Sequence, residues 1–107
     1  MSHVSSLAFA VLMVACTGQA CANDFEVTQK NMTFSPAELN IKVGDTVTFK
    51  NEDTTNHNIF SLSDAKSFDL GAYSAGQSKK VTFDKAGSVD VECAMHDTMH
   101  MKITVAK

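Results

Sequence analysis

The residue types best suited to chemistry are gathered near the end of the chain, between positions 93 and 101. This segment reads Cys-Ala-Met-His-Asp-Thr-Met-His-Met, so it holds one thiol, two imidazoles and three thioethers. A further histidine, His57, follows a polar loop and opens a strand-like stretch, from which it can join the same site. Thiolate, imidazole and thioether ligands suit copper, whereas structural zinc favours more thiolates or a Cys-x-x-Cys pair.

These ligand types are those of a blue-copper site, in which one cysteine and two histidines form a plane and a methionine binds weakly along the axis. The arrangement is a compromise between the geometries that Cu(I) and Cu(II) prefer, so little moves when an electron arrives or leaves. Because the protein supplies every ligand, no position stays open for a substrate. The ligand set therefore favours electron transfer over metal-assisted hydrolysis.

The elements that must position these residues read as short strands. Apolar and polar residues alternate in segments around positions 25–34, 39–43, 47–49, 57–62, 81–83, 89–93 and 101–105. Residues 51–56 form a polar loop, residues 63–76 are mixed and predicted to be irregular, and no helical period persists. The pattern predicts one all-β domain, a Greek-key antiparallel β-sandwich of seven to eight strands. In such a sandwich, the strand that ends at Cys93 and the strand that begins at His57 can meet at one pole.

The first 22 residues read as an export signal. They contain no Lys, Arg, Asp or Glu, and their apolar run over positions 7–15 is shorter than the roughly 20 residues that span a bilayer. Ala20-Cys21-Ala22 provides a small-x-small cleavage pattern. We expect a signal peptide over 1–22, a mature copper-binding domain over 23–107 and a periplasmic location. The alternative is a lipoprotein box ending at Cys16, which would carry a lipid.

Cleavage would leave Cys93 as the single cysteine, which excludes an internal disulfide in the mature chain. The whole chain carries nine lysines, no arginine and twelve acids, for a net charge of −3. This balance gives no footprint for nucleic acid and no basic stretch for a membrane surface, and no membrane span is predicted. The acidic side chains are expected on a solvated face. They include Asp24, Glu26, Asp53, Asp64 and Asp69.

Residues 25–106 resemble the cupredoxins, the plastocyanin, amicyanin and pseudoazurin group of exported blue-copper proteins. The motifs that carry the resemblance are Phe34-Ser35-Pro36, Leu39-x-Ile41-x-Val43-Gly44-Asp45-Thr46-Val47-x-Phe49-x-Asn51, His57-Asn58, Val81-x-Phe83-x-x-x-Gly87 and Cys93-x-x-His96-x-x-Met99. The resemblance implies one copper ion bound by His57 and His96 through Nδ1, by Cys93 through Sγ and by Met99 through Sδ. It also implies that Asn58 fastens the two ligand loops by hydrogen bonds near the cysteine.

The axial ligand has two candidates, Met99 and Met101. Met101 shares the inward phase of Ile103 and Val105 on the last strand, which favours a core position for it. Lys102 follows Met99 by three residues, the spacing found in the similar proteins. We therefore predict Met99 as the axial ligand.

Several positions depart from the cupredoxin pattern. Asp97 stands where proline often follows the second histidine, and Val91 stands where an aromatic residue often precedes the cysteine. Ala94 offers no hydroxyl to pair with Asn58. Met95 and His100 are additional soft ligands, which leaves room for a second, weaker copper site.

Three functions remain open, and none is an enzyme, because Cys93 has no orienting acid or oxyanion device in view. The first is a monomeric electron carrier that exchanges electrons with periplasmic redox proteins, such as a dehydrogenase or cytochrome c, through the edge of His96. The second is a copper-handling protein that stores or delivers Cu(I). Its soft ligands would be Met95, Met99, His100 and Met101. The third is a redox component dedicated to one enzyme.

Overall fold

The computed structural model describes residues 22–107, which form nine β-strands and contain no helix that could cross a membrane. The predicted signal peptide falls almost wholly on residues outside this range, and so does Cys16, so both stay predictions. The strands are β1 (Asp24–Lys30), β2 (Thr33–Ser35), β3 (Glu38–Lys42), β4 (Thr46–Asn51), β5 (His57–Ser63), β6 (Lys66–Tyr73), β7 (Ser78–Thr82), β8 (Gly87–Cys93) and β9 (His96–Ala106).

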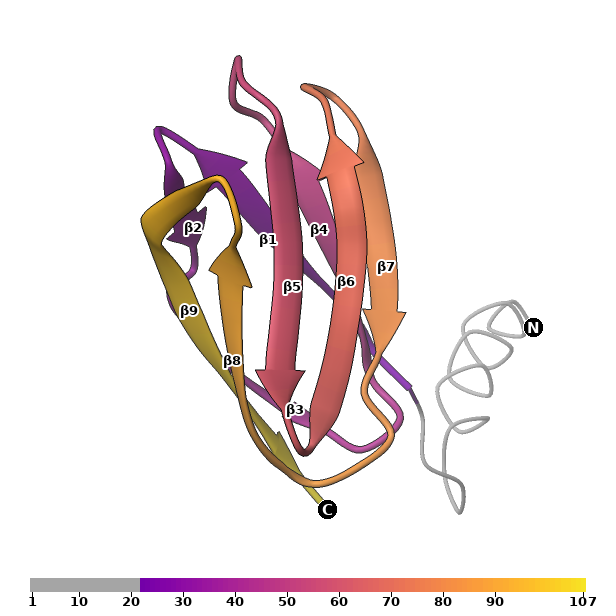
Figure 1. The fold of residues 1–107 in the computed structure, drawn as a ribbon. Coiled ribbons are helices and arrows are strands. Elements are labelled where there is room, and N and C mark those ends of the chain that lie inside the picture. Colours follow the sequence, from indigo (N-terminus) through magenta and orange to yellow (C-terminus); the bar gives the residue numbers. More distant parts are fainter. Residues whose placement is uncertain (1–21) are drawn as a thin grey trace, which may run out of the picture.

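The strands form two sheets that pack face to face (Figure 1). One sheet has the order β2-β1-β4-β7 and the other has the order β3-β9-β8-β5-β6. The predicted β-sandwich is confirmed, but it has nine strands, and two of its pairs, β1 with β4 and β3 with β9, are parallel. Alternation predicts which side chains face the core, but it carries no information on the direction of the neighbouring strand. The two sheets are therefore mixed, where purely antiparallel ones were expected.

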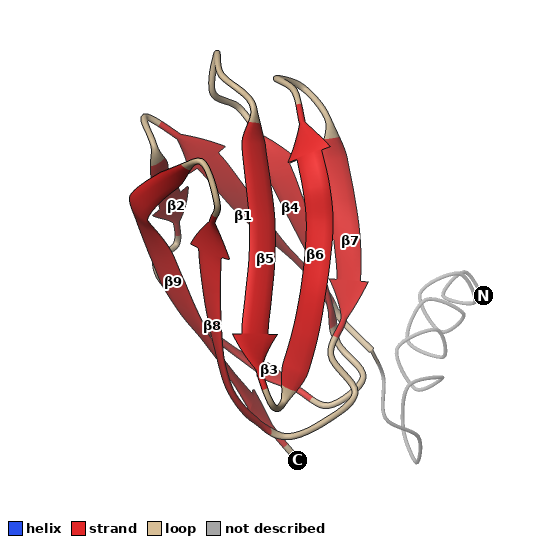
Figure 2. Ribbon diagram, in the orientation of Figure 1, coloured by secondary structure: helices blue, strands red, loops and turns tan. Residues whose placement is uncertain are grey.

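Strand β6 corrects the prediction that residues 63–76 are irregular (Figure 2). It lies at the edge of its sheet and pairs only with β5. The register between the two shifts between Asn58 and Phe60, and Gly71 has a positive φ of 73°. An edge strand with such an irregularity keeps no clean period of two, so its pattern was hidden from sequence analysis.

The core lies between the sheets and is built from every second residue of the strands, the one that faces inward. Val89, Val91 and Cys93 of β8 share one inward phase, and so do the apolar residues of β9. Fully burying one such side chain is worth about 1.5–3 kcal/mol. Because Cys93 continues the phase of Val89 and Val91, its thiol is delivered to the end of the core and away from solvent.

Strand pairing also determines where the candidate ligands meet. Ile59 pairs with Cys93, and Cys93 pairs with His96, so the start of β5, the end of β8 and the start of β9 lie at one pole. This pole is the upper end of the molecule in Figure 1. Only Ala94 and Met95 separate β8 from β9. The last strand therefore begins five residues before Met101, where sequence analysis expected it to start.

Candidate metal centre

Three of the four predicted ligands meet in the structure. The Cys93 Sγ atom lies 3.5 Å from His57 Nδ1 and 3.7 Å from His96 Nδ1. One donor atom from each residue fits within 4.8 Å of the others, and these residues are the one such group of His, Cys, Asp or Glu side chains in residues 22–107. His57 and Cys93 are buried, whereas His96 is partly exposed.

This donor set fits a single soft-to-borderline metal ion. Both histidines turn Nδ1 toward the thiol, and their rings meet nearly edge to face, with centroids 4.9 Å apart and planes at 64°. Metal–nitrogen and metal–sulfur bonds of about 2.0–2.3 Å would fit among donor atoms at these separations. One thiolate with two imidazoles in a nearly dry site is a set suited to copper.

Met99 and Met101 are equally buried, each 1% exposed, so burial does not separate the two axial candidates. Their positions along β9 do differ. Met101 pairs with Val91, below the level of the cysteine, whereas the register shifts so that Cys93 pairs with His96. Met99 therefore lies in the irregular segment next to the site, which favours it over Met101.

Asp53 contacts a predicted ligand, whereas sequence analysis placed it on a solvated face. Its Oδ2 lies 2.9 Å from His57 Nε2, the ring nitrogen that faces away from the thiol. The same carboxylate accepts hydrogen bonds from the backbone N–H groups of Asn31, at 3.0 Å, and Met32, at 2.9 Å. The Met32 amide is the largest cause that lowers the pKa of Asp53, and the hydrogen bond from His57 adds to it.

The two backbone donors belong to the tight turn between β1 and β2. Asn31 and Met32 both have φ of 55°, the left-handed conformation that a two-residue hairpin turn requires. Asp53 therefore ties this turn, in one sheet, to His57 in the other. The spacing of four residues between Asp53 and His57 was the available signal, but it is too common to identify such a pair from the sequence.

Asn58 holds the neighbouring strand ends together through its backbone. Its N–H donates to Cys93 Sγ at 3.5 Å, and its carbonyl accepts from the Ala94 N–H at 2.9 Å. Its side-chain amide donates to Asp69 Oδ1 at 2.9 Å, on the neighbouring strand β6. Asp69 was also expected on a solvated face; it is exposed, but this hydrogen bond gives it a partner next to the site.

The additional soft ligands do not join this group. Met95 is 53% exposed in the turn between β8 and β9. His100 is exposed on β9, and its Nε2 lies 3.6 Å from Asp90 Oδ1. Within residues 22–107, no second group of His, Cys, Asp or Glu side chains gathers to hold the weaker copper site.

Comparisons with known proteins agree with this geometry. Residues 20–106 match the family model described as copper binding proteins, plastocyanin/azurin family. The chain is 32% identical over 102 residues to the methylamine utilization protein MauL of Methylorubrum extorquens, an alignment that covers 94% of this chain and 88% of MauL. It is 34% identical over 79 residues to amicyanin of Paracoccus denitrificans, covering 69% of this chain and 59% of amicyanin.

Solved structures show the same relationship. A reduced variant of amicyanin superimposes with a TM-score of 0.71 at 29% identity, covering 77% of this chain and 81% of that one. A purple cupredoxin from Nitrosopumilus maritimus superimposes with a TM-score of 0.70 at 26% identity, covering 78% of this chain and all of that one. The chain therefore belongs to the plastocyanin/azurin family of copper-binding proteins, the cupredoxins, and copper is its cofactor.

Proposed function

We propose that this protein is an electron carrier that exchanges one electron at a time through a copper ion. His57, Cys93 and His96 would hold the copper ion, with Met99 as the fourth ligand. The observation that carries the proposal is the donor set itself, whose thiol and imidazoles lie within 4.8 Å of one another at the ends of β5, β8 and β9. Copper bound there would supply the Cu(II)/Cu(I) couple that one-electron exchange requires.

The surrounding residues keep the ligands in one arrangement. Asp53 accepts a hydrogen bond from His57 Nε2, which selects the tautomer whose Nδ1 lone pair faces Cys93. The Asn58 N–H donates to the Cys93 sulfur and withdraws electron density from it. Such contacts limit movement between the two oxidation states and influence the reduction potential.

His96 is the one partly exposed residue among the three gathered ligands, so its edge is the proposed path for electrons. Ala94, Met95 and Thr98 are exposed beside it and would form a small surface for brief contacts. Electron-transfer complexes of this kind have small interfaces, below about 1,200 Å². Asp97 adds a negative charge to this surface and favours a partner with a basic docking face.

We further propose that the protein acts as a monomer in the periplasm, exported by the signal peptide over 1–22. MauL is a methylamine utilization protein, and this resemblance supports a dehydrogenase of a small amine as the electron donor. A cytochrome c would be the acceptor. A carrier dedicated to one such dehydrogenase would use the same copper site and differ only in the specificity of docking.

Copper handling is the competing function, and the structure gives it less support. It requires accessible soft ligands, whereas Met99 and Met101 are buried in the core. Met95 and His100 are left exposed, and His100 is next to Asp90.

The visible spectrum of the purified protein, titrated with Cu(II) and then reduced, tests the proposal. We expect an intense thiolate-to-copper band that disappears on reduction and returns on oxidation. Cys93→Ser should abolish the band and electron transfer, and Met99→Leu should shift both spectrum and potential. Met101→Leu is the matched control and should leave the spectrum unchanged. A colourless protein whose Cys93→Ser variant still binds Cu(I) tightly would contradict the proposal and support copper handling.

A further inference from the structure

The side chain of Asn58 is anchored outside the strand ends that carry the cysteine. Its Nδ2 donates to Asp69 Oδ1 at 2.9 Å, so its amide is bound to the edge strand β6. The residue next to the cysteine, Ala94, offers only a methyl group and its backbone. The side chain of Asn58 therefore has no hydroxyl partner beside Cys93, and its hydrogen bond goes to β6 instead.

Asp69 is itself held in place for this contact. The backbone N–H of Gly71 donates to the same oxygen, Asp69 Oδ1, at 2.9 Å. Gly71 adopts a φ of +73°, a left-handed conformation that glycine accommodates, so the strand departs from regular β geometry directly after this contact. On the opposite strand, the β5–β6 register shifts between Asn58 and Phe60. The shift places Asp69 opposite Phe60, and from there its carboxylate accepts the hydrogen bond of the Asn58 side chain, two residues earlier on β5.

The charge on Asp69 suits this arrangement. The hydrogen bond from Gly71 is the largest cause that lowers the pKa of the Asp69 carboxyl, and the Asn58 side chain is the second. The carboxylate is therefore the stable form at neutral pH and accepts both donors at once.

The backbone of Asn58 connects this anchor to the thiol. Its N–H donates to Cys93 Sγ at 3.5 Å, and its carbonyl accepts from Ala94 at 2.9 Å. A displacement of Asn58 would change the length of the N–H···S contact directly. Hydrogen bonds to the cysteine sulfur are one of the factors that set the potential of a blue-copper site.

We propose that Asp69 is a positioning residue of the copper centre, which fixes Asn58 and thereby the hydrogen bond to the Cys93 sulfur. The inference rests on the proposed copper site. It places one control of the reduction potential on an exposed residue of β6, outside the segment that supplies the cysteine and the second histidine. The carboxylate of Asp69 accepts from Asn58 and Gly71, so its influence on the thiol passes through Asn58.

Two substitutions separate positioning from charge. Asp69→Asn removes the charge but keeps an oxygen that can accept from Asn58 and Gly71. Asp69→Ala removes both the charge and the acceptor. The loss of a nearby negative charge raises the potential in both variants, and this contribution weakens with added salt. The loss of the anchor lowers the potential in Asp69→Ala alone, because the N–H···S contact weakens, and this contribution persists at high salt.

Two measurements should be made on the full chain. In the metal-free protein, NMR should show that the Asn58 side-chain amide protons exchange with solvent about two- to tenfold faster in Asp69→Ala than in Asp69→Asn. In the copper protein, Asp69→Ala should have a lower potential than Asp69→Asn, and a shifted thiolate-to-copper band, at every ionic strength. In an Asn58→Ala background, the difference between the two Asp69 variants should vanish.

Equal Asn58 exchange, equal potentials and equal spectra in the two variants would overturn the proposal and leave Asp69 as a surface charge. A difference that survives in the Asn58→Ala background would also overturn it. The NMR measurement needs no copper, so a failure of the positioning role can be told apart from a failure of the protein to form a blue-copper site.

Discussion

Single residues behind the ligands decide how well the metal centre is organised. His57 contributes one ring nitrogen to the group of ligand atoms and gives the other to Asp53 at 2.9 Å. A carboxylate in this position orients the ring and increases the basicity of the ligand nitrogen. Asp53 also accepts two backbone donors of the β1–β2 turn, so one side chain supports a ligand and a left-handed turn together.

Replacing Asp53 should therefore affect stability as well as the site. We expect Asp53→Ala to lower the free energy of unfolding of the metal-free protein by about 1–2 kcal/mol at pH 7, because three hydrogen bonds lose their acceptor. Chemical denaturation measures this loss. Glu38→Ala, which removes an exposed acid from β3, is the control and should change stability little.

The loss of unfolding free energy in Asp53→Ala should become smaller at low pH. The pKa of Asp53 is lowered from its ordinary value of 3.8, so its stabilising contribution is fully present above that value. The contribution is lost as the pH falls through the lowered pKa of the folded state. The gap in unfolding free energy between the native protein and Asp53→Ala should thus narrow below about pH 4. A gap that stays constant down to pH 2 would contradict this role.

The ligands could be predicted from the sequence because their types and spacing are rare in combination. Cys93, His96 and Met99 are three residues apart from one to the next, and His57 follows a polar loop. Asp53 and Asp69 could not be predicted in this way, since their partners come from other strands. An acidic residue in a polar stretch has the same sequence pattern whether its carboxylate faces water or a buried histidine.

At the scale of elements, strands with one buried face were predictable and the irregular ones were not. Alternation identified β4 and β8, in which Val47, Phe49, Val89, Val91 and Cys93 are buried. It missed β6, an edge strand with a register shift, and it placed the start of β9 too late. The register shift beside Cys93 interrupts the period of two at the point where His96 and Met99 enter the site.

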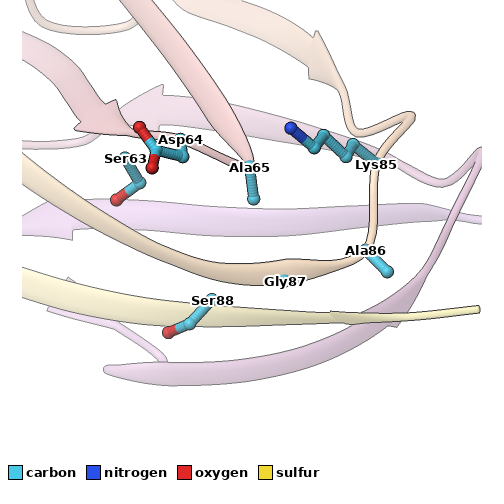
Figure 3. A pocket seen from close by; sticks show the side chains of 7 residues that line it. All are labelled: Ser63, Asp64, Ala65, Lys85, Ala86, Gly87 and Ser88. Atoms are coloured by element: carbon cyan, nitrogen blue, oxygen red, sulfur yellow. The ribbon is translucent and has the colours of Figure 1, made fainter.

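At the pole opposite the ligands, the β5–β6 turn lies close to the start of β8, and this contact can be tested. Gly87, the first residue of β8, lies against Ala65 in the β5–β6 turn, beside a shallow pocket (Figure 3). A Cβ at Gly87 would meet the Ala65 Cβ at 2.8 Å, and its φ of +146° disfavours other residues. We expect Gly87→Ala to cost about 1–3 kcal/mol of stability.

The copper spectrum of Gly87→Ala should be unchanged, because β8 separates Gly87 from Cys93 by about 20 Å. Thermal unfolding and the visible spectrum measure the two effects. Gly76→Ala is the matched control, with a φ of +84° and no atom within 4 Å, and it should show only the backbone cost. Adding Ala65→Gly to Gly87→Ala should restore part of the loss. An equal loss in the two single variants would show that the contact with Ala65 is unimportant.

At the scale of the whole molecule, the strand frame positions the ligands. Strand pairing and the hydrogen bonds of Asp53 and Asn58 hold the thiol and the imidazoles at one pole. A domain of this size buries a modest core, so a bound ion adds a large share of its stability.

Copper should therefore raise the melting temperature without changing the secondary structure. At a free copper concentration of 100 times the dissociation constant, the gain is about 2.7 kcal/mol, or roughly 10–20 °C for a small domain. Calorimetry measures the shift, and far-ultraviolet circular dichroism should show the same β content with and without copper. Cys93→Ser should lose most of the gain. A metal-free protein that lacks β structure would contradict a fold that depends on strand pairing.

The position of β9 inside its sheet determines when that sheet can fold. β9 pairs with β3 on one side and β8 on the other, so Leu39 must wait for Ile103 before its ladder can form. Cys93, His96 and Met99 also lie in this last part of the chain. While the chain is still emerging from the ribosome, it contains His57 but not the other ligands. One of its two sheets also lacks β9, an interior strand. Folding of this sheet must therefore wait for β9, and pairings between such distant residues make it slow compared with that of a helical protein of equal length.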